Sequence, residues 1–272
     1  MSRVKARLKF MVDHLGTEGV LERVETKLGR TLQRFDLPPI AAHPSAHVGV
    51  HPQRQDGLFS IGAPVRLGLT SGDQLIAVAD LAEEIGGDVR LTRQQNLIVT
   101  GVRDVDAALE RLAAIGLPLD TNEIWANSIA CTGEPHCNFS VGETKTRLQS
   151  LVEHLETTFG PAVGDLRLHL DGCPHACAQH WVGDLGFQAT TGKDDDGNRV
   201  SAYDIFVRGG RLQIGTSLFR RVPSDRLEGA VEGLVRGWLE TGETFTDFQR
   251  RLSDDELGAL AGLEPARKRV AA

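Results

Sequence analysis

The sequence has few cysteines, no long apolar run and no excess of basic residues. Four cysteines in 272 residues are too few for the disulfide scaffold of a small secreted protein. No apolar run approaches the roughly 18 residues that span a bilayer, and residues 1–7 lack the apolar core of a signal peptide. We therefore expect a soluble, cytoplasmic protein with no membrane partner, whose cysteines are reduced thiols or metal ligands.

The charge balance is acidic, with 37 acidic residues against 30 basic ones and a net charge of −7. Nucleic-acid binding requires a basic face for the phosphates, so we expect no nucleic-acid partner. An apolar fraction of 40% with 25% charged residues is ordinary for a globular protein and argues against a disordered or collagen-like chain. At about 150 residues per domain, the length fits two domains or one large one.

Composition divides the chain into segments of different character. Residues 1–35 contain two short amphipathic patterns separated by Gly16, which predict a helical appendage. Residues 36–53 contain four prolines and three histidines without periodicity, and this predicts a linker. The Ala-, Arg- and Lys-rich residues 263–272 predict a flexible tail. Two folded regions remain, at residues 54–120 and 121–262.

The first folded region, residues 54–120, has the pattern of a ferredoxin-like unit. A strand pattern ends before Ser71, which has capping-box spacing to Gln74 and is expected to begin a helix. Further strands are expected at residues 89–91 and 96–99, and a second helix at 106–115. The order strand, helix, strand, strand, helix, with room for a last strand, is typical of the split βαβ arrangement.

The second folded region, residues 121–262, mixes helical and strand patterns. Ser140 and Glu143 have capping-box spacing and predict the start of a helix that runs through Leu155. Alternation over residues 166–170 predicts a half-buried strand. We also expect hairpin strands at residues 185–191 and 203–208 and an amphipathic helix at 227–239.

All four cysteines lie in Gly- and Pro-containing segments of this second region. Five residues separate Cys131 from Cys137, and three separate Cys173 from Cys177. We expect each pair at a turn that leads into a helix, where unpaired amides stabilise an anionic metal centre. Four cysteines suit a 4Fe–4S cluster, which tolerates varied spacings. Structural zinc, whose paired ligands are usually about two to four residues apart, and buried inert thiols remain the alternatives.

Three motifs resemble those of a known family, the ferredoxin-dependent nitrite and sulfite reductases. Cys-Thr-Gly-Glu-Pro-His-Cys at residues 131–137, followed by Glu-Thr-Lys at 143–145, resembles the family's first cluster motif. Asp-Gly-Cys-Pro-His-Ala-Cys at residues 171–177 resembles its second, and residues 90–97 are similar to a segment of its ferredoxin-like half. The order of these parts also agrees, so the resemblance covers most of the chain. The chain resembles the C-terminal half of the full-length members of this family.

The resemblance implies an α+β fold in which a ferredoxin-like half-domain precedes a domain that binds sirohaem and a 4Fe–4S cluster. The four cysteines would hold the cluster, and the last one, Cys177, would also bind the sirohaem iron as its axial thiolate. Ferredoxin or a similar one-electron donor would supply electrons for the six-electron reduction of nitrite to ammonia. Candidate cofactor-binding residues, by the same resemblance, are Arg93, Gln95, Asn96 and Lys145.

The resemblance also implies that part of the enzyme is missing from this chain. Full-length members have two related halves with the sirohaem between them, and the residues that bind the substrate anion lie mainly in the other half. We therefore expect a complementary half-subunit or a homodimer, and we assign no catalytic residue here. Reduction of sulfite to sulfide is the nearest alternative activity. A non-catalytic cofactor-binding or electron-transfer subunit is a further alternative.

Overall fold

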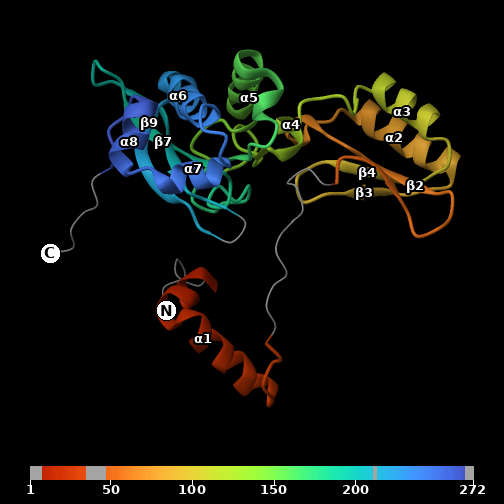
Figure 1. The fold of residues 1–272 in the computed structure, drawn as a ribbon, viewed down its shortest axis with the longest axis horizontal. Helices are drawn as coiled ribbons and strands as arrows, with labels where there is room; N and C mark the ends of the chain where they lie inside the picture. Colours follow the sequence, from red (N-terminus) through yellow and green to blue (C-terminus); the bar gives the residue numbers. More distant parts are fainter. Residues whose placement is uncertain (1–7, 35–46, 211–212, 267–272) are drawn as a thin grey trace. The chain divides into compact units, whose positions relative to one another are not determined.

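The computed structural model describes residues 8–34, 47–210 and 213–266 of the chain, which divides into one unit at residues 1–42 and another at 43–272. The first unit contains helix α1 (Leu8–Leu28), drawn in red in Figure 1. Its backbone leaves the helical conformation at Gly16, with φ 69° and ψ 171°, which is where the sequence predicts a break. Most of the expected linker and most of the expected tail lie outside the described residues.

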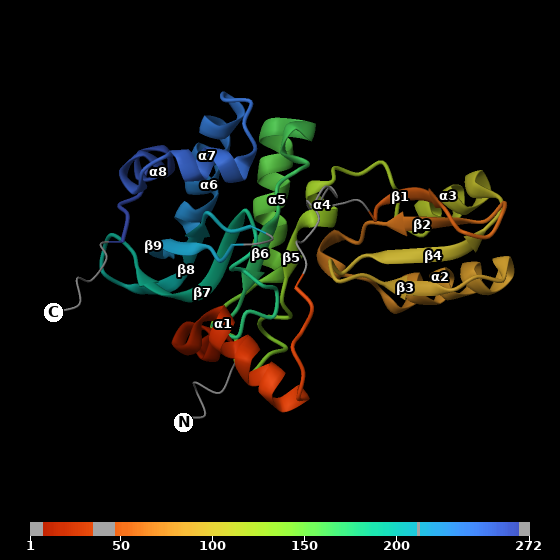
Figure 2. The ribbon, with the colours of Figure 1, turned by 60° about the horizontal axis from the view of Figure 1, so that its bottom comes forward.

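A four-stranded antiparallel sheet with strand order β1-β2-β4-β3 begins the second unit. Helices α2 and α3 cover one face of this sheet (Figure 2). The helix that we expected at Ser71 is confirmed, because Ser71 and Gln74 form the capping box at the start of α2. The elements are β1 (Gly49–Pro52), β2 (Phe59–Ala63), η2 (Arg66–Gly68), α2 (Gly72–Ile85), β3 (Val89–Leu91), β4 (Leu97–Val102) and α3 (Val105–Ala114).

The fourth strand of this sheet comes from an unexpected place. We expected it after the second helix, but no strand follows α3 at residues 117–119. Instead β1, which composition assigned to the linker, pairs with β2 in the register Gly49↔Gly62. Gly62 permits this pairing because a Cβ there would lie 1.6 Å from the His47 carbonyl oxygen. The fourth position of the sheet is therefore filled from the N-terminal side.

The rest of the second unit is built on a five-stranded sheet with strand order β5-β6-β7-β8-β9. Strands β5, β6 and β7 are parallel neighbours, whereas β7, β8 and β9 form an antiparallel meander. The elements are α4 (Ile124–Asn127), β5 (Ile129–Ala130), α5 (Lys145–Phe159), η3 (Gly160–Val163), β6 (Leu168–Asp171), β7 (Leu185–Lys193), β8 (Arg199–Val207), β9 (Thr216–Pro223), η4 (Ser224–Arg226), α6 (Leu227–Leu239), α7 (Phe245–Arg251) and α8 (Asp254–Ala261).

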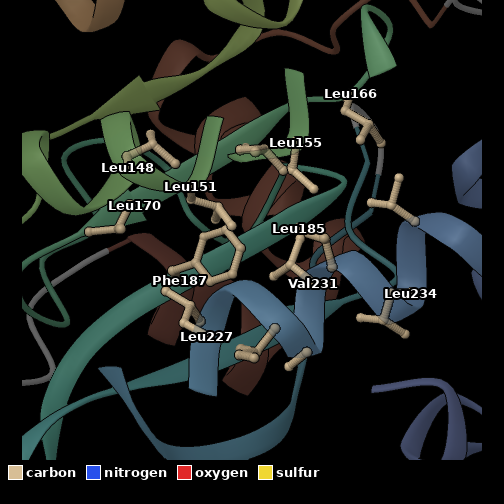
Figure 3. Packing of buried hydrophobic residues seen from close by; sticks show 14 of the residues in the cluster. Leu148, Leu151, Leu155, Leu166, Leu170, Leu185, Phe187, Leu227, Val231 and Leu234 are labelled. Carbon is tan, nitrogen blue, oxygen red and sulfur yellow. The ribbon is translucent and has the colours of Figure 1, made fainter. Parts of the chain in front are cut away.

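Helices α5 and α6 pack against one face of this sheet and form the larger hydrophobic core. Leu151 and Leu155 of α5 meet Phe187 of β7 and Val231 of α6, and all four side chains are fully buried (Figure 3). A second, smaller core lies between the four-stranded sheet and helices α2 and α3.

No helix of the described residues is long and apolar enough to cross a membrane. The α+β fold class that we expected is confirmed.

Two local predictions in this region are wrong. Helix α5 begins at Lys145 rather than after Ser140, because the Ser140 hydroxyl donates a hydrogen bond to the Gly142 carbonyl oxygen at 2.7 Å instead of capping the helix. The strand β6 is buried at all four positions rather than on alternate ones. Parallel strands flank β6, the helical core covers its Leu168 and Leu170 face, and the loop after the strand covers the face of His169 and Asp171.

Candidate metal centre

Two of the four cysteines lie at the same edge of the five-stranded sheet. Cys131 directly follows β5, and Cys173 follows β6 after a single glycine. These strands are parallel and adjacent, with Ala130 opposite Leu170, so their carboxyl ends meet at one edge. In open α/β sheets this edge is the usual place for a ligand.

Hydrogen bonds join the two cysteine-containing loops. The Cys131 amide donates to the Leu170 carbonyl oxygen at 3.0 Å, and the Gly172 amide donates to the Cys131 sulfur at 3.2 Å. The Val141 amide donates to the Gly172 carbonyl oxygen at 2.9 Å. A Cβ on Gly172 would lie 1.9 Å from the Ser140 hydroxyl, so only glycine permits this approach.

The side chains of the two loops also meet. The Cys173 sulfur lies 3.3 Å from Nδ1 of His175, and the His175 ring packs edge-on against Phe139 with 5.1 Å between centroids. Cys173 is buried, Cys131 and Cys137 are half-buried, and Cys177 is exposed.

Neither cysteine pair lies at a helix N-terminus, so our expectation of two loop-to-helix junctions is wrong. Helix α5 begins well beyond Cys137, and residues 172–184 contain turns and bends up to the start of β7. The amides that approach the sulfurs therefore come from loop backbone. The Gly172 amide at the Cys131 sulfur is the direct example.

The electrostatic environment of Cys131 favours its neutral thiol when no metal is present. Burial raises the pKa of the Cys131 thiol above its ordinary value, while the hydrogen bond from the Gly172 amide acts in the opposite direction. A bound metal deprotonates a coordinating thiol outright, because its own charge is the largest in the site. Metal binding at Cys131 is therefore expected to release the proton of its thiol.

The four cysteines match the donor chemistry of an iron–sulfur cluster better than that of a single metal ion. In the part of the chain that the structure describes, no three His, Cys, Asp or Glu side chains converge on a single metal ion. A 4Fe–4S cluster takes four cysteine thiolates, and hydrogen bonds to the sulfurs tune its potential. Four cysteines on joined loops, with an amide already directed at one sulfur, fit the donor chemistry of such a cluster.

Two of the residues expected to bind a cofactor contact each other beside Cys131. The Lys145 ammonium donates to Oε1 of Gln95 at 3.0 Å and to the Leu67 carbonyl oxygen. The Gln95 amide in turn donates to the Ala130 carbonyl oxygen at 3.0 Å. Burial lowers the pKa of Lys145 to about 8, and the Cys131 thiolate opposes this decrease. Gln95 therefore bonds to the backbone that leads into the first cysteine, and Lys145 holds Gln95.

The other two expected cofactor-binding residues have different surroundings. Asn96 is buried; its Oδ1 accepts from the Val65 amide at 2.8 Å and its Nδ2 donates to the Ala126 carbonyl oxygen at 2.9 Å. The second of these bonds joins the region of the four-stranded sheet to helix α4. Arg93 is exposed, and no hydrogen bond or ion pair of its side chain occurs within the described residues.

The structure also assigns roles to residues that the sequence reasoning missed. The Thr144 hydroxyl donates to the Cys131 carbonyl oxygen at 2.6 Å. Asp171 and His180, both almost completely buried, form a hydrogen-bonded pair beneath the second cysteine loop. Thr144 and Asp171 lie inside the segments that carry the family resemblance, which was the available signal. His180 lies beyond its motif, and the sequence indicates only that it is one of four histidines close to the cysteines.

Comparison with known proteins places these features in a family. Residues 51–115 match the family model described as the nitrite/sulfite reductase ferredoxin-like half domain. The chain is 36% identical over 270 residues to sulfite reductase (ferredoxin) 1 of Mycolicibacterium paratuberculosis, covering 94% of this chain and 48% of that protein. It is 31% identical over 266 residues to the chloroplastic ferredoxin–nitrite reductase of Oryza sativa subsp. japonica, covering 94% and 43%.

A solved structure, the NirA protein of Mycobacterium tuberculosis, matches with a TM-score of 0.83 and 31% identity, over 94% of this chain and 50% of that one. The chain thus spans about half the length of the curated relatives that it matches. The resemblance carried by the cysteine motifs is confirmed: this chain is a homologue, about half as long, of the ferredoxin-dependent nitrite and sulfite reductases.

Proposed function

We propose that this chain is the cluster- and sirohaem-binding half of an assimilatory reductase that reduces nitrite to ammonia. Cys131, Cys137, Cys173 and Cys177 would hold the 4Fe–4S cluster, and exposed Cys177 would also bind the sirohaem iron. When bound, these groups supply the electron transfer and the reduction of the anion. The observation that carries the proposal is the joining of two cysteine loops at the carboxyl ends of adjacent parallel strands, with the Gly172 amide on the Cys131 sulfur.

The chain's own residues have defined tasks in this proposal. The Cys131 backbone is held at both ends, by the Leu170 carbonyl oxygen at its amide and by the Thr144 hydroxyl at its carbonyl oxygen. Lys145 places a cation near the Cys131 thiolate, which favours the charged ligand form. These contacts would order the first ligand before the cluster arrives.

Two observations bear on the choice between nitrite and sulfite. Residues 131–133 and 143–145 resemble the nitrite-reducing branch. Among the matched proteins, one at 36% and one at 34% identity are named sulfite reductases, whereas two others at 34% identity are named nitrite reductases. Sulfite reduction to sulfide is therefore the second candidate. Rates with each anion, measured on the same cofactor-loaded preparation with reduced ferredoxin, separate the two activities. A larger kcat/KM for sulfite would overturn the nitrite proposal.

The length of the chain favours a further candidate, a cofactor-binding or electron-transfer subunit without turnover of its own. Because the relatives are about twice as long, we propose that activity requires a complementary half-subunit or a second copy of this chain. Turnover should then appear only in the assembled species. Nitrite reduction by a preparation shown to be monomeric by sedimentation would contradict this requirement.

The cofactors are tested by an anaerobic absorption spectrum with iron, sulfide and zinc analysis of the full chain. A sirohaem band with about four cluster irons per chain is expected. Cys137→Ser should lose cluster iron and sulfide, whereas Val141→Ala, an exposed side chain of the same loop, should retain them. One zinc with neither iron nor acid-labile sulfide would overturn the proposal.

A further inference from the structure

The loop that carries Cys173 and Cys177 has no helix or strand of its own, yet one side chain organises it. Residues 172–184 run as turns between β6 and β7. Asp171, the last residue of β6, accepts hydrogen bonds from the Ala178 amide at 2.7 Å and from the His180 amide at 3.1 Å. Its carboxylate also accepts a bond from Nδ1 of His180 at 2.8 Å. Three donors from the far side of the loop therefore converge on one buried carboxylate.

Backbone strain in this loop shows why such a carboxylate is needed. Ala176 and Gln179 have left-handed backbone angles, with φ of 56° and 59°. Non-glycine residues in such conformations persist only where the surrounding structure compensates for the strain. The Ala178 amide lies between these two residues, and the His180 amide follows the second. The bonds to Asp171 therefore act where the strain is concentrated.

His180 contributes through one ring nitrogen only. Asp171 is 1% exposed and His180 is 0% exposed, so water does not compete for their hydrogen bond. Within the described residues, Nε2 of His180 is buried and has no hydrogen-bond partner. The ring packs against Phe206, with 4.6 Å between centroids. The orientation of the ring is therefore set by Nδ1 and by packing.

We infer that Asp171 and His180 are positioning residues that hold the Cys173–Cys177 loop in the conformation that presents both thiolates to the cluster. Charge-assisted hydrogen bonds to Asp171 hold the loop against β6, and such bonds are shorter and stronger than neutral ones. This inference deepens the proposed function and rests on it for the identity of the metal centre. The loop conformation itself is a property of the chain without the cluster.

Paired substitutions at His180 separate hydrogen bonding from packing. In His180→Asn the side-chain amide takes the place of Nδ1 and retains the donor to Asp171. In His180→Gln the amide takes the place of Nε2 and the donor is lost, although glutamine fills more of the space. If His180 acted only through packing, His180→Gln should behave more like the wild type than His180→Asn. Our inference predicts the reverse, because only His180→Asn retains the donor to Asp171.

The first readout is the rate at which Cys173 is alkylated in the iron-free full chain, followed by mass spectrometry. Cys173 is buried and reacts when the loop opens, while exposed Cys177 is the internal reference. Asp171→Asn and His180→Gln should accelerate the Cys173 reaction about tenfold relative to Cys177, the effect of one lost charge-assisted bond. His180→Asn and the exposed control Asp195→Asn should remain near the wild-type rate.

The second readout is the electron paramagnetic resonance spectrum of the reduced, reconstituted protein. His180→Asn should retain the wild-type signal, and His180→Gln should shift or lose it. Equal behaviour of the two variants, or better behaviour of the glutamine variant, would overturn the inference even if Asp171→Asn does not fold. If the wild-type chain binds no cluster, the proposed function fails, while the alkylation rates still decide whether Asp171 and His180 hold the loop.

Discussion

Burial of the Lys145 ammonium group removes part of its hydration, which costs free energy that its contacts must offset. Its ammonium group is buried far enough that its pKa falls to about 8, and it donates to the Leu67 carbonyl oxygen and to Gln95. A long flexible side chain tolerates such a position when polar acceptors and an anion surround its charge. Here the acceptors are the Leu67 carbonyl oxygen and Gln95, and Cys131 would supply the anion once a bound metal holds it as a thiolate.

Removing this cation should destabilise the chain. Lys145→Met leaves the Leu67 carbonyl oxygen and Oε1 of Gln95 without their donor, so we expect a loss of about 1–3 kcal/mol in the free energy of unfolding. Urea denaturation of the iron-free protein measures this loss. Lys193→Met removes the same charge from an exposed strand end and should change stability little. Equal effects of the two substitutions would show that the contacts of Lys145 do not stabilise the fold.

His169 makes stability depend on pH. Burial lowers its pKa from 6.5 to about 4, and its Nδ1 donates to the Gln179 carbonyl oxygen at 3.1 Å. Above pH 6.5 the ring is neutral in both the folded and the unfolded chain; as the pH falls from 6.5 toward about 4, the unfolded chain binds the proton more readily, so stability decreases. The decrease should reach about 3 kcal/mol.

The pH dependence is measured by urea denaturation between pH 7 and about pH 4, the range that the shift of His169 defines. His169→Asn should flatten the curve, whereas His14→Asn, at an exposed position, should preserve it. An unchanged slope in His169→Asn would assign the dependence to other groups.

At the scale of elements, local capping predicted one helix correctly and another incorrectly. The Ser71 hydroxyl and the Gln74 side-chain oxygen bond to the backbone of their own helix start, and α2 begins there. Near α5 the hydroxyls have other partners: Ser140 donates to the Gly142 carbonyl oxygen and lies against Gly172, and Thr144 donates to the Cys131 carbonyl oxygen. Contacts between the cysteine loops therefore take precedence over helix capping.

Helices α6 and α8 pack so closely that glycine is required between them. A Cβ on Gly233 would lie 2.0 Å from the Leu260 carbonyl oxygen, so Gly233→Ala should cost about 1–3 kcal/mol through overpacking. Gly229 lies in the same helix, and a Cβ there would meet nothing within 4 Å, so Gly229→Ala should stabilise by up to about 1 kcal/mol. Thermal unfolding of both variants tests this, and a stabilising Gly233→Ala would contradict the close approach.

At the scale of the whole second unit, the two hydrophobic cores are joined by polar contacts and by one apolar residue. Leu67 follows the four-stranded sheet's β2 in sequence, yet its side chain belongs to the core of the five-stranded sheet. Asn96 bonds to the Val65 amide and to the Ala126 carbonyl oxygen. These links hold the ferredoxin-like sheet against the region that carries the cysteines.

Breaking the polar link should uncouple the two cores. Asn96→Ala leaves a buried amide and a buried carbonyl group without partners, so we expect a loss of about 1–3 kcal/mol and a broadened or two-step thermal transition. Calorimetry detects the second step, and Gln94→Ala is the adjacent control. A single sharp transition at the wild-type temperature would show that Asn96 does not couple the cores.

What the sequence determines by itself is the set of features that depend on short-range interactions. The capping box of α2, the hairpin of β7 and β8, and helix α6 follow from residues within a few positions of one another. The cysteine spacing and its neighbouring residues are likewise local, and they were sufficient to indicate the family that the comparisons confirmed.

Only the tertiary structure decided the features that join distant segments. Strand β1 reached the sheet from a proline-rich stretch because Gly62 admits the His47 carbonyl oxygen. The bond between the Gly172 amide and the Cys131 sulfur requires two strands to lie side by side, and the partner of Asp171 lies beyond the cysteine motif. Periodicity and spacing report on neighbours along the chain, whereas these contacts depend on the packing of the whole second unit.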